Sequence, residues 1–209
     1  MTHVYAFGSI IRGEIDNYSD IDLLAIANSY NPNFSVEKFS IYSEKRLLEL
    51  WKEGNPFAWH LHHESKLLFS SDGNDPLLNY GAPNAYRKGP YDCLKFYELF
   101  INSQKSLIQS RKSACFELSA IFLSLRNFAT CYVLYLEKEN LFSRRSALML
   151  GDKSAPISID DFDICMRARA LSTRGIGETI SKKEIEQVIN TLPSLQTWME
   201  KLLGEVNEK

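Results

Sequence analysis

Apolar residues in the first 75 positions come in short runs that are separated by turn-forming residues. Runs of four to eight apolar or alternating residues between turns are typical of β-strands, whereas apolar residues three and four positions apart predict a helix. The segment 43–53 has the helical spacing and ends at Gly54, a residue type that often terminates helices. A short helical stretch is also expected after Gly8. Strands are expected at 4–7, 23–27, 36–42, 57–62 and 66–69.

The pattern changes at residues 70–91, which are rich in Gly, Pro, Asn and Asp, and it is helical from there onward. Ser181 and Glu184 have the spacing of a capping box at the start of the last helix. The sequence therefore predicts an α+β fold, with a small mixed β-sheet domain at 1–75, a linker at 76–91 and an α-helical bundle at 92–209. The expected helices of the bundle are 92–109, 113–138, 143–150, 159–172 and 182–203.

Composition narrows the class of protein. The chain has 209 residues, of which 44% are apolar, and a formal net charge of −2. This near-neutral charge argues against extended nucleic-acid binding, which needs a basic surface. The apolar stretch 114–136 is long enough to span a membrane, but Glu117, Arg126 and Asn127 interrupt it, so we expect a buried helix. We expect a cytoplasmic protein without a signal peptide, with reduced core cysteines at Cys93, Cys115, Cys131 and Cys165.

Two acidic residues precede the second apolar run, in the pattern Asp20-Ile21-Asp22. In a strand, alternate side chains share a face, so Asp20 and Asp22 are expected to point the same way, with Ile21 and Leu23 in the core. Two carboxylates on one face repel each other unless a cation lies between them. Oxygen ligands of this kind suit Mg²⁺ or Mn²⁺. The alternative is that both aspartates only solvate the end of a strand.

Gly8 and Ser9 follow the first apolar run, and ten residues separate Ser9 from Asp20. A glycine lets the backbone approach an anion closely, and a serine at a helix start can donate from its hydroxyl and its N–H group. These residues therefore predict a phosphate-binding turn, with an ordinary turn as the alternative. A phosphate site next to a metal site favours phosphoryl or nucleotidyl transfer.

This constellation, set between two apolar strands, resembles the polymerase-β-like nucleotidyltransferases, and within them the minimal nucleotidyltransferase branch. The resemblance covers the first 75 residues. The residues that carry it are Gly8, Ser9, Arg12, Gly13, Ser19, Asp20 and Asp22.

The resemblance implies an enzyme that moves a nucleoside monophosphate from ATP, or another nucleoside triphosphate, onto a hydroxyl or a phosphate end by a two-metal mechanism. Asp20 and Asp22 would be catalytic and would hold Mg²⁺ or Mn²⁺. Gly8, Ser9 and Arg12 would bind the nucleotide. Relatives of this kind modify small antibiotics, partner proteins as in toxin–antitoxin pairs, or RNA ends. We expect a small molecule or a protein as acceptor, and no membrane partner, and leave homo-oligomerisation open.

The same resemblance implies a third carboxylate on the strand after Asp-x-Asp. Ser40 occupies the position where we expect that acid, and Glu37 is expected on the opposite strand face. Glu64 is the other candidate catalytic carboxylate. The alternatives are a relocated acid and a weakened site. In the second case the protein would be a nucleotide-binding regulatory protein, similar to an antitoxin, with the same fold.

Three histidines lie in the expected strand at 57–62 and just after it, with His60 and His62 on one face. One hypothesis is that they bind Zn²⁺ or Mn²⁺, contact a triphosphate or act as a base. The alternative is an ordinary half-buried strand with polar residues outward, since a structural zinc site normally has four protein ligands.

The helical half loosely resembles HEPN-type domains, whose active members cleave RNA with an Arg and a nearby His. Arg126 lies in the most apolar helix, but every histidine of the chain precedes residue 64. The ribonuclease hypothesis therefore fails. We expect Arg126 to form a structural ion pair, with a role at the active-site cleft as the alternative. The remaining arginines of interest are expected on the solvated surface, or else to contact a triphosphate tail or an acidic acceptor: Arg144, Arg145, Arg167, Arg169 and Arg174.

Overall fold

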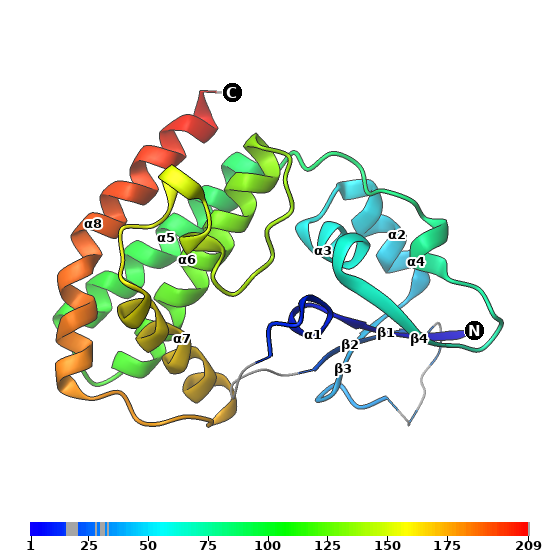
Figure 1. Cartoon of the computed structure of the whole chain (residues 1–209), viewed down its shortest axis with the longest axis horizontal. Coiled ribbons are helices and arrows are strands. Elements are labelled where there is room, and N and C mark those ends of the chain that lie inside the picture. Colours follow the sequence, from blue (N-terminus) through cyan, green and yellow to red (C-terminus); the bar gives the residue numbers. More distant parts are fainter. Residues whose placement is uncertain (16–20, 28, 30–31, 33, 209) are drawn as a thin grey trace. The chain divides into compact units, whose positions relative to one another are not determined.

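The computed structural model describes residues 1–15, 21–27, 29, 32 and 34–208, and it confirms the predicted α+β class. The chain forms two compact units, Met1–Arg87 and Lys88–Lys209, hereafter unit 1 and unit 2. A mixed sheet and short helices form unit 1, and long helices form unit 2 (Figure 1). The linker expected at 76–91 contains a short helix at Pro76–Asn79 and the first residues of a long one that begins at Gly89.

The sheet of unit 1 has, within the described residues, four strands in the order β3-β2-β1-β4. The central strand β1 pairs antiparallel with both β2 and β4, and β2 pairs parallel with β3. In the β1–β2 register, Phe7 lies opposite Asp22 and Tyr5 lies opposite Leu24. The strands are β1 Thr2–Phe7, β2 Asp22–Ala27, β3 Phe39–Tyr42 and β4 Ser65–Ser70.

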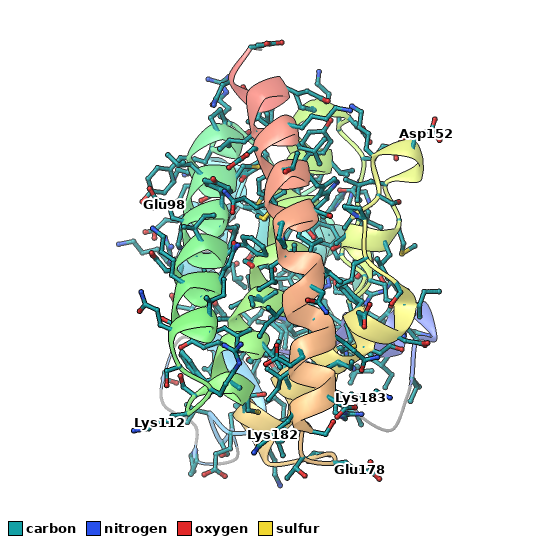
Figure 2. All side chains as sticks on the ribbon, turned by 90° about the vertical axis from the view of Figure 1, so that its left-hand side faces the viewer. Glu98, Lys112, Asp152, Glu178, Lys182 and Lys183 are labelled. Carbon is teal, nitrogen blue, oxygen red and sulfur yellow. The ribbon has the colours of Figure 1, made fainter. Side chains whose placement is uncertain are left out.

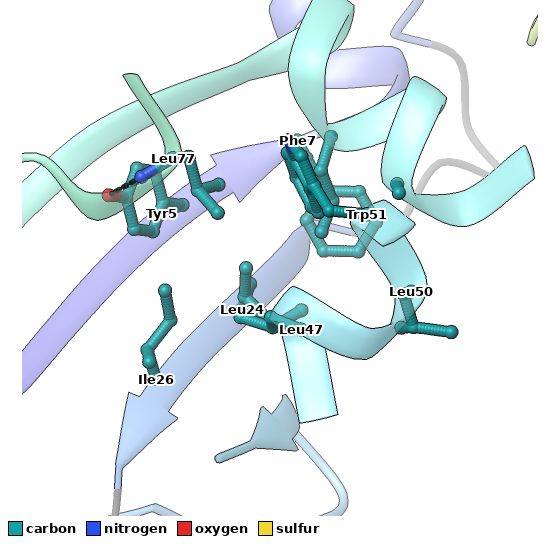
Figure 3. Packing of buried hydrophobic residues seen from close by; sticks show 10 residues of the cluster. Tyr5, Phe7, Leu24, Ile26, Leu47, Leu50, Trp51 and Leu77 are labelled. Carbon is teal, nitrogen blue, oxygen red and sulfur yellow. Dashed lines mark hydrogen bonds between the residues drawn. The ribbon is translucent and has the colours of Figure 1, made fainter. Parts of the chain in front are cut away.

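Three helices cover one face of this sheet: α2 Glu44–Glu53, α3 Pro56–Glu64 and α4 Pro76–Asn79 (Figure 1). The core between them and the sheet is apolar and largely buried (Figure 3). A fourth, short helix, α1 Ser9–Arg12, follows β1 directly. The core residues labelled in Figure 3 are Tyr5, Phe7, Leu24, Ile26, Leu47, Leu50, Trp51 and Leu77.

The prediction that Ile21 and Leu23 point into the core was wrong. The helices cover the face that carries Leu24 and Ile26, which is also the face of Asp22, because alternate residues share a face. Ile21 precedes the strand and is 62% exposed. Asp22 therefore lies at the end of the core-facing side, where the apolar packing stops.

The predicted strand at 57–62 was also wrong, because these residues belong to α3. Asn55 caps the helix, with its side-chain oxygen accepting a hydrogen bond from the Phe57 backbone N–H at 2.8 Å, and Pro56 occupies the first helical position. Both are favoured at helix starts. Ala58 and Leu61, three apart, are fully buried, as the helical period requires.

Two further boundaries differ from the prediction. Of the strand expected at 36–42, only Phe39–Tyr42 forms a strand, which is β3, and residues 36–38 form a turn. The helix expected at 143–150 is only a 3₁₀ turn, η1 Ser146–Leu148, followed by a second one, η2 Gly151–Lys153. There the Ser143 hydroxyl accepts a hydrogen bond from the Arg145 backbone N–H at 3.2 Å, a local bond that competes with regular helix formation.

Unit 2 is built from α5 Gly89–Gln109, α6 Ala114–Leu136, α7 Ile159–Arg174 and α8 Lys182–Asn207. The central helix α6 packs against the other three. Charged side chains such as Glu98 and Lys112 project from the outside of the bundle (Figure 2). Among the described residues α6 alone is long and apolar enough to cross a membrane, but 72% of its apolar window is buried inside the structure. A core helix passes the same test.

The capping box predicted for the last helix is confirmed. The Ser181 hydroxyl accepts from the Glu184 backbone N–H at 3.2 Å, and the Glu184 carboxylate accepts from the Ser181 backbone N–H at 2.8 Å. The same carboxylate pairs with Arg167 of α7. The hydrogen bond from Arg167, followed by those from Ser181, lowers the pKa of the Glu184 carboxyl to about 2.

This pKa gives a stability prediction. A carboxyl whose pKa is lower in the folded state than its ordinary 4.5 stabilises the fold above pH 4.5 and loses that contribution as the pH falls towards 2. We expect Glu184→Gln to lower the free energy of unfolding by about 0.5–1 kcal/mol near pH 7, because glutamine can keep the capping contact but not the charge that pairs with Arg167. The difference from the parent protein should shrink steadily below pH 4.5.

Urea unfolding across this pH range measures the effect. Glu186→Gln is the matched control, because Glu186 lies on the same helix and makes only an exposed pair with Arg111. A parent-to-variant difference for Glu184→Gln that does not change between pH 7 and pH 3 would contradict the prediction.

Candidate active site

The turn between β1 and α1 forms the centre of the candidate site. Gly8 occupies this turn with φ of +74°, a backbone conformation that other residues rarely adopt. A Cβ atom at Gly8 would lie 2.8 Å from Oδ2 of Asp22 and 3.7 Å from Cε1 of His60. The absence of a side chain at Gly8 therefore lets the Asp22 carboxylate and the His60 ring lie close against the turn. We call the Gly8 turn, with these two groups beside it, the Gly8 cradle.

Ser9 lies directly beside the cradle and is only 4% exposed. Its Oγ atom is buried and has no hydrogen-bond partner among the residues that the structure describes. A buried hydroxyl without a partner costs free energy, unless a bound group satisfies it. Gly8 and Ser9 together thus fit an anionic ligand such as a phosphate group.

Asp22 is held in place by strand pairing. It is the first residue of β2 and lies opposite Phe7, the residue before Gly8, so its carboxylate reaches the cradle. Asp22 also lines a groove of about 420 Å³, together with its neighbours in residues 21–23 and with residues 36–40. We call this the Asp22 groove. Asp20 and Ser19 lie outside the described residues, so the expected pairing of the two aspartates stays a prediction.

The donor set is partly suited to a divalent cation. Asp22 supplies a carboxylate beside the Gly8 turn, and carboxylates are the ligand type that Mg²⁺ and Mn²⁺ prefer. Within the described ranges no group of three or more His, Cys, Asp or Glu side chains could hold a metal ion. Binding of Mg²⁺ or Mn²⁺ through Asp20 and Asp22 remains a prediction that depends on both aspartates.

Ser40 lies where the third carboxylate was expected. In the parallel β2–β3 register Ser40 pairs with Leu24, and Leu24 shares a strand face with Asp22. Glu37 is not on the strand, as we had expected, but in the turn at 36–38, so the argument that put it on the opposite face does not apply. It lines the Asp22 groove.

Glu64, the other predicted carboxylate, ends α3 and is engaged by two partners. Its Oε2 atom lies 2.9 Å from His60 Nε2, one helical turn earlier, and also accepts a hydrogen bond from the Arg12 guanidinium. Burial alone would raise the pKa of the Glu64 carboxyl, but the hydrogen bond and charge of His60, with the charge of Arg12, outweigh it and lower that pKa.

Helical geometry also separates the three histidines. His60 points to the cradle, whereas His62 and His63 are exposed and lie beside Trp59, whose ring stacks on His63 at 5.7 Å. The placement of His60 and His62 on one strand face was therefore wrong. Burial, followed by the charge of His62, lowers the pKa of His63. The pair of His60 and Glu64 was missed, although its four-residue spacing would have indicated it once Asn55-Pro56 was taken as a helix start.

The arginines of unit 2 make contacts within that unit. Arg145 pairs with Asp163 at 2.7 Å, and Arg167 pairs with Glu184. Arg126 donates to the Phe142 backbone carbonyl at 3.4 Å. These contacts support structural roles, and the expected ion pair of Arg126 stays a prediction.

Comparison with known protein families finds one domain model that is similar to most of unit 1. Residues 2–71 match the family model described as nucleotidyltransferase domain. This range contains all four described strands and the helices α1, α2 and α3. The match supports the polymerase-β-like nucleotidyltransferase superfamily for this unit, whereas the minimal branch and the HEPN-like resemblance of unit 2 remain predictions.

The whole chain is also similar in structure to a solved protein, whereas no curated protein matches the sequence. Among solved structures, the chain is similar to spectinomycin adenyltransferase AAD(9) from Enterococcus faecialis, described with ATP and spectinomycin, at 12% identity and a TM-score of 0.44. The similarity covers 95% of this chain and 91% of that one.

Proposed function

We propose that the protein transfers a nucleoside monophosphate, with ATP as the expected donor, onto a hydroxyl group of a small molecule or a protein. The observation that carries this proposal is the Gly8 cradle. It combines a glycine turn, a buried serine hydroxyl without a described partner and a carboxylate that lies close against the turn. Such an arrangement is suited to holding a phosphate chain next to a metal-binding carboxylate.

Each residue of the cradle has a role in this proposal. Gly8 and Ser9 bind the phosphate tail of the nucleotide, and Arg12 adds a fixed positive charge nearby. Asp22, with Asp20, would hold Mg²⁺ or Mn²⁺. When bound, such an ion neutralises phosphate charge and lowers the pKa of an attacking hydroxyl.

We place the acceptor in the Asp22 groove. Its rim exposes apolar side chains, with Val36 83% and Ile21 62% exposed, and it also contains Lys38 and Glu37. A mixed rim of this kind is suited to a small molecule or a protein segment that carries both polar and apolar groups.

The alternative is a regulatory nucleotide-binding protein that turns over slowly. Ser40 favours it, because a hydroxyl stands where a third carboxylate would bind a cation and assist the acceptor. Ser40→Asp, compared with the uncharged Ser40→Asn, tests this alternative. If the missing acid limits turnover, we expect Ser40→Asp to raise the rate at least about tenfold, equivalent to about 1.4 kcal/mol. Equal rates for both variants would show that the acid is not missing.

Label transfer from α-labelled ATP, with Mg²⁺ or Mn²⁺, tests the proposed function. The acceptor panel contains the protein itself, aminoglycosides, lincosamides, total RNA and proteins from a cell extract. The Asp20→Asn/Asp22→Asn double variant is the control. Label that requires both aspartates supports an enzyme and shows the acceptor class. Nucleotide binding without any labelled acceptor would favour the regulatory alternative, and no binding at all would refute both.

A further inference from the structure

Glu64 connects three parts of the site. Its backbone carbonyl accepts a hydrogen bond from the Gly8 backbone N–H at 3.1 Å, which fixes the cradle turn against the end of α3. Its carboxylate is bound by Arg12, from the helix after the cradle, and by His60, one turn back on its own helix. The pairing of β1 with β4 explains this proximity, because Ser65 lies opposite Phe7.

The surroundings make these contacts strong. The side chains of Arg12, His60 and Glu64 are 18%, 13% and 13% exposed, so water screens them only weakly. The Phe7 ring packs edge-to-face against the His60 ring, with 5.5 Å between their centroids. His60 is therefore held from two sides, and the Cε1 edge of its ring faces the cradle.

We propose that Glu64 is a positioning residue that holds Arg12 and His60 beside the Gly8 cradle, where both contact the phosphate tail of the bound nucleotide. This inference rests on the proposed function and assigns His60 to the nucleotide site. It also differs from the sequence-based prediction for Glu64, which made this carboxylate catalytic.

The bonding of Glu64 is the reason for this assignment. Its Oε2 atom contacts both the Arg12 guanidinium and the His60 imidazole. A carboxylate with two such partners fixes the orientation of both side chains. Arg12 also pairs with Glu14, with 2.9 Å between its Nε atom and Glu14 Oε2, so its guanidinium is held between two carboxylates.

Direct binding measurements separate the two roles without requiring an acceptor. The probes are α,β-methylene-ATP, whose α–β bridge blocks transfer, and Mn²⁺ followed by its magnetic resonance signal. We expect Glu64→Gln and His60→Gln each to weaken binding of the ATP analogue about tenfold, as expected for the loss of a charge-assisted contact. Mn²⁺ binding should not change.

Two controls accompany these variants. His62→Gln changes an exposed histidine on the same helix and should leave nucleotide affinity unchanged. In a double-variant cycle, Glu64→Gln should add less than about twofold once His60→Gln and Arg12→Lys are present, because a positioning residue acts through the groups it holds. This non-additivity would not arise from a purely structural loss of stability. If Glu64→Gln folds poorly, the comparison of His60→Gln with His62→Gln still tests whether His60 contacts the nucleotide, and equal affinities would overturn the inference.

The outcomes distinguish this inference from the proposed function. Weaker Mn²⁺ binding by Glu64→Gln, with unchanged affinity for the ATP analogue, would make Glu64 a metal ligand and overturn the inference alone. Fully additive effects in the cycle would also overturn it. If the parent protein binds no ATP analogue, the proposed function itself falls.

Discussion

Replacing Asp22 and Asp20 with asparagine is expected to reduce label transfer from ATP by at least about 10³-fold while leaving the fold intact. A group that stabilises an oxyanion or binds a metal ion at a reaction centre typically contributes this much to the rate. Asp22 stands at the end of the core-facing side of β2, where the apolar packing stops, so its loss should cost little stability. Initial rates of label incorporation and thermal unfolding measure the two effects together.

Asp152→Asn is the matched control for this pair of substitutions. Asp152 is an exposed aspartate in η2 of unit 2, and it projects from the surface in Figure 2. This control removes a carboxylate without touching the cradle, and its rate should equal that of the parent. A double variant that retains a tenth of the parental rate would refute the role of the aspartates.

Gly8→Ala is expected to abolish nucleotide binding, whereas Gly13→Ala should leave it intact. Both glycines have a positive φ, but Gly13 has the left-handed helical conformation, with ψ of 14°, whereas Gly8 has ψ of −138°, close to a conformation that almost only glycine adopts. Alanine should therefore cost about 1 kcal/mol of backbone strain at Gly13 and about 1–3 kcal/mol at Gly8. Only at Gly8 does the new Cβ meet other atoms, at 2.8 Å from Asp22 Oδ2, while nothing lies within 4 Å of a Cβ at Gly13. The methyl group would push the Asp22 carboxylate away from the turn.

The two variants should therefore differ moderately in stability and strongly in nucleotide affinity. The atom that Gly8→Ala displaces is the end of a flexible side chain, which can rotate at little cost. We expect the free energy of unfolding from urea titrations to fall by up to about 2 kcal/mol more for Gly8→Ala than for Gly13→Ala. We expect at least about 100-fold weaker binding of ATP for Gly8→Ala alone, equivalent to about 2.7 kcal/mol. Equal nucleotide affinities for the two variants would show that the phosphate chain lies elsewhere.

Local signals in the sequence predicted much of the fold. The helical period and the capping box at Ser181 defined α8, since both depend only on residues near in sequence. The segment 57–62 was misassigned because aromatic and apolar residues alternate with histidines there and imitate a strand. Asn55 and Pro56 decide the outcome by starting a helix, and two buried residues three apart maintain it.

The candidate site was predictable to the extent that it follows from one strand pairing. Gly8 and Asp22 meet because Phe7 lies opposite Asp22, and the motif spacing had indicated this proximity. The contact of Arg12 with Glu64 could not be foreseen, because it requires the pairing of β1 with β4, whereas the pair of His60 and Glu64 requires only the helical state of α3. Long-range pairing of this kind leaves no local trace in the sequence.

The position of β1 between β2 and β4 affects how unit 1 folds while the chain is being synthesised. The Thr2 backbone N–H donates to the Ser71 hydroxyl at 2.9 Å, a contact between residues 69 positions apart. Contacts this distant in sequence slow folding, because a long loop must close before they form. During synthesis one edge of β1 must remain unpaired until β4 has left the ribosome. Yield in a cell should therefore depend on the growth temperature and on chaperones that shield an unpaired strand from aggregation.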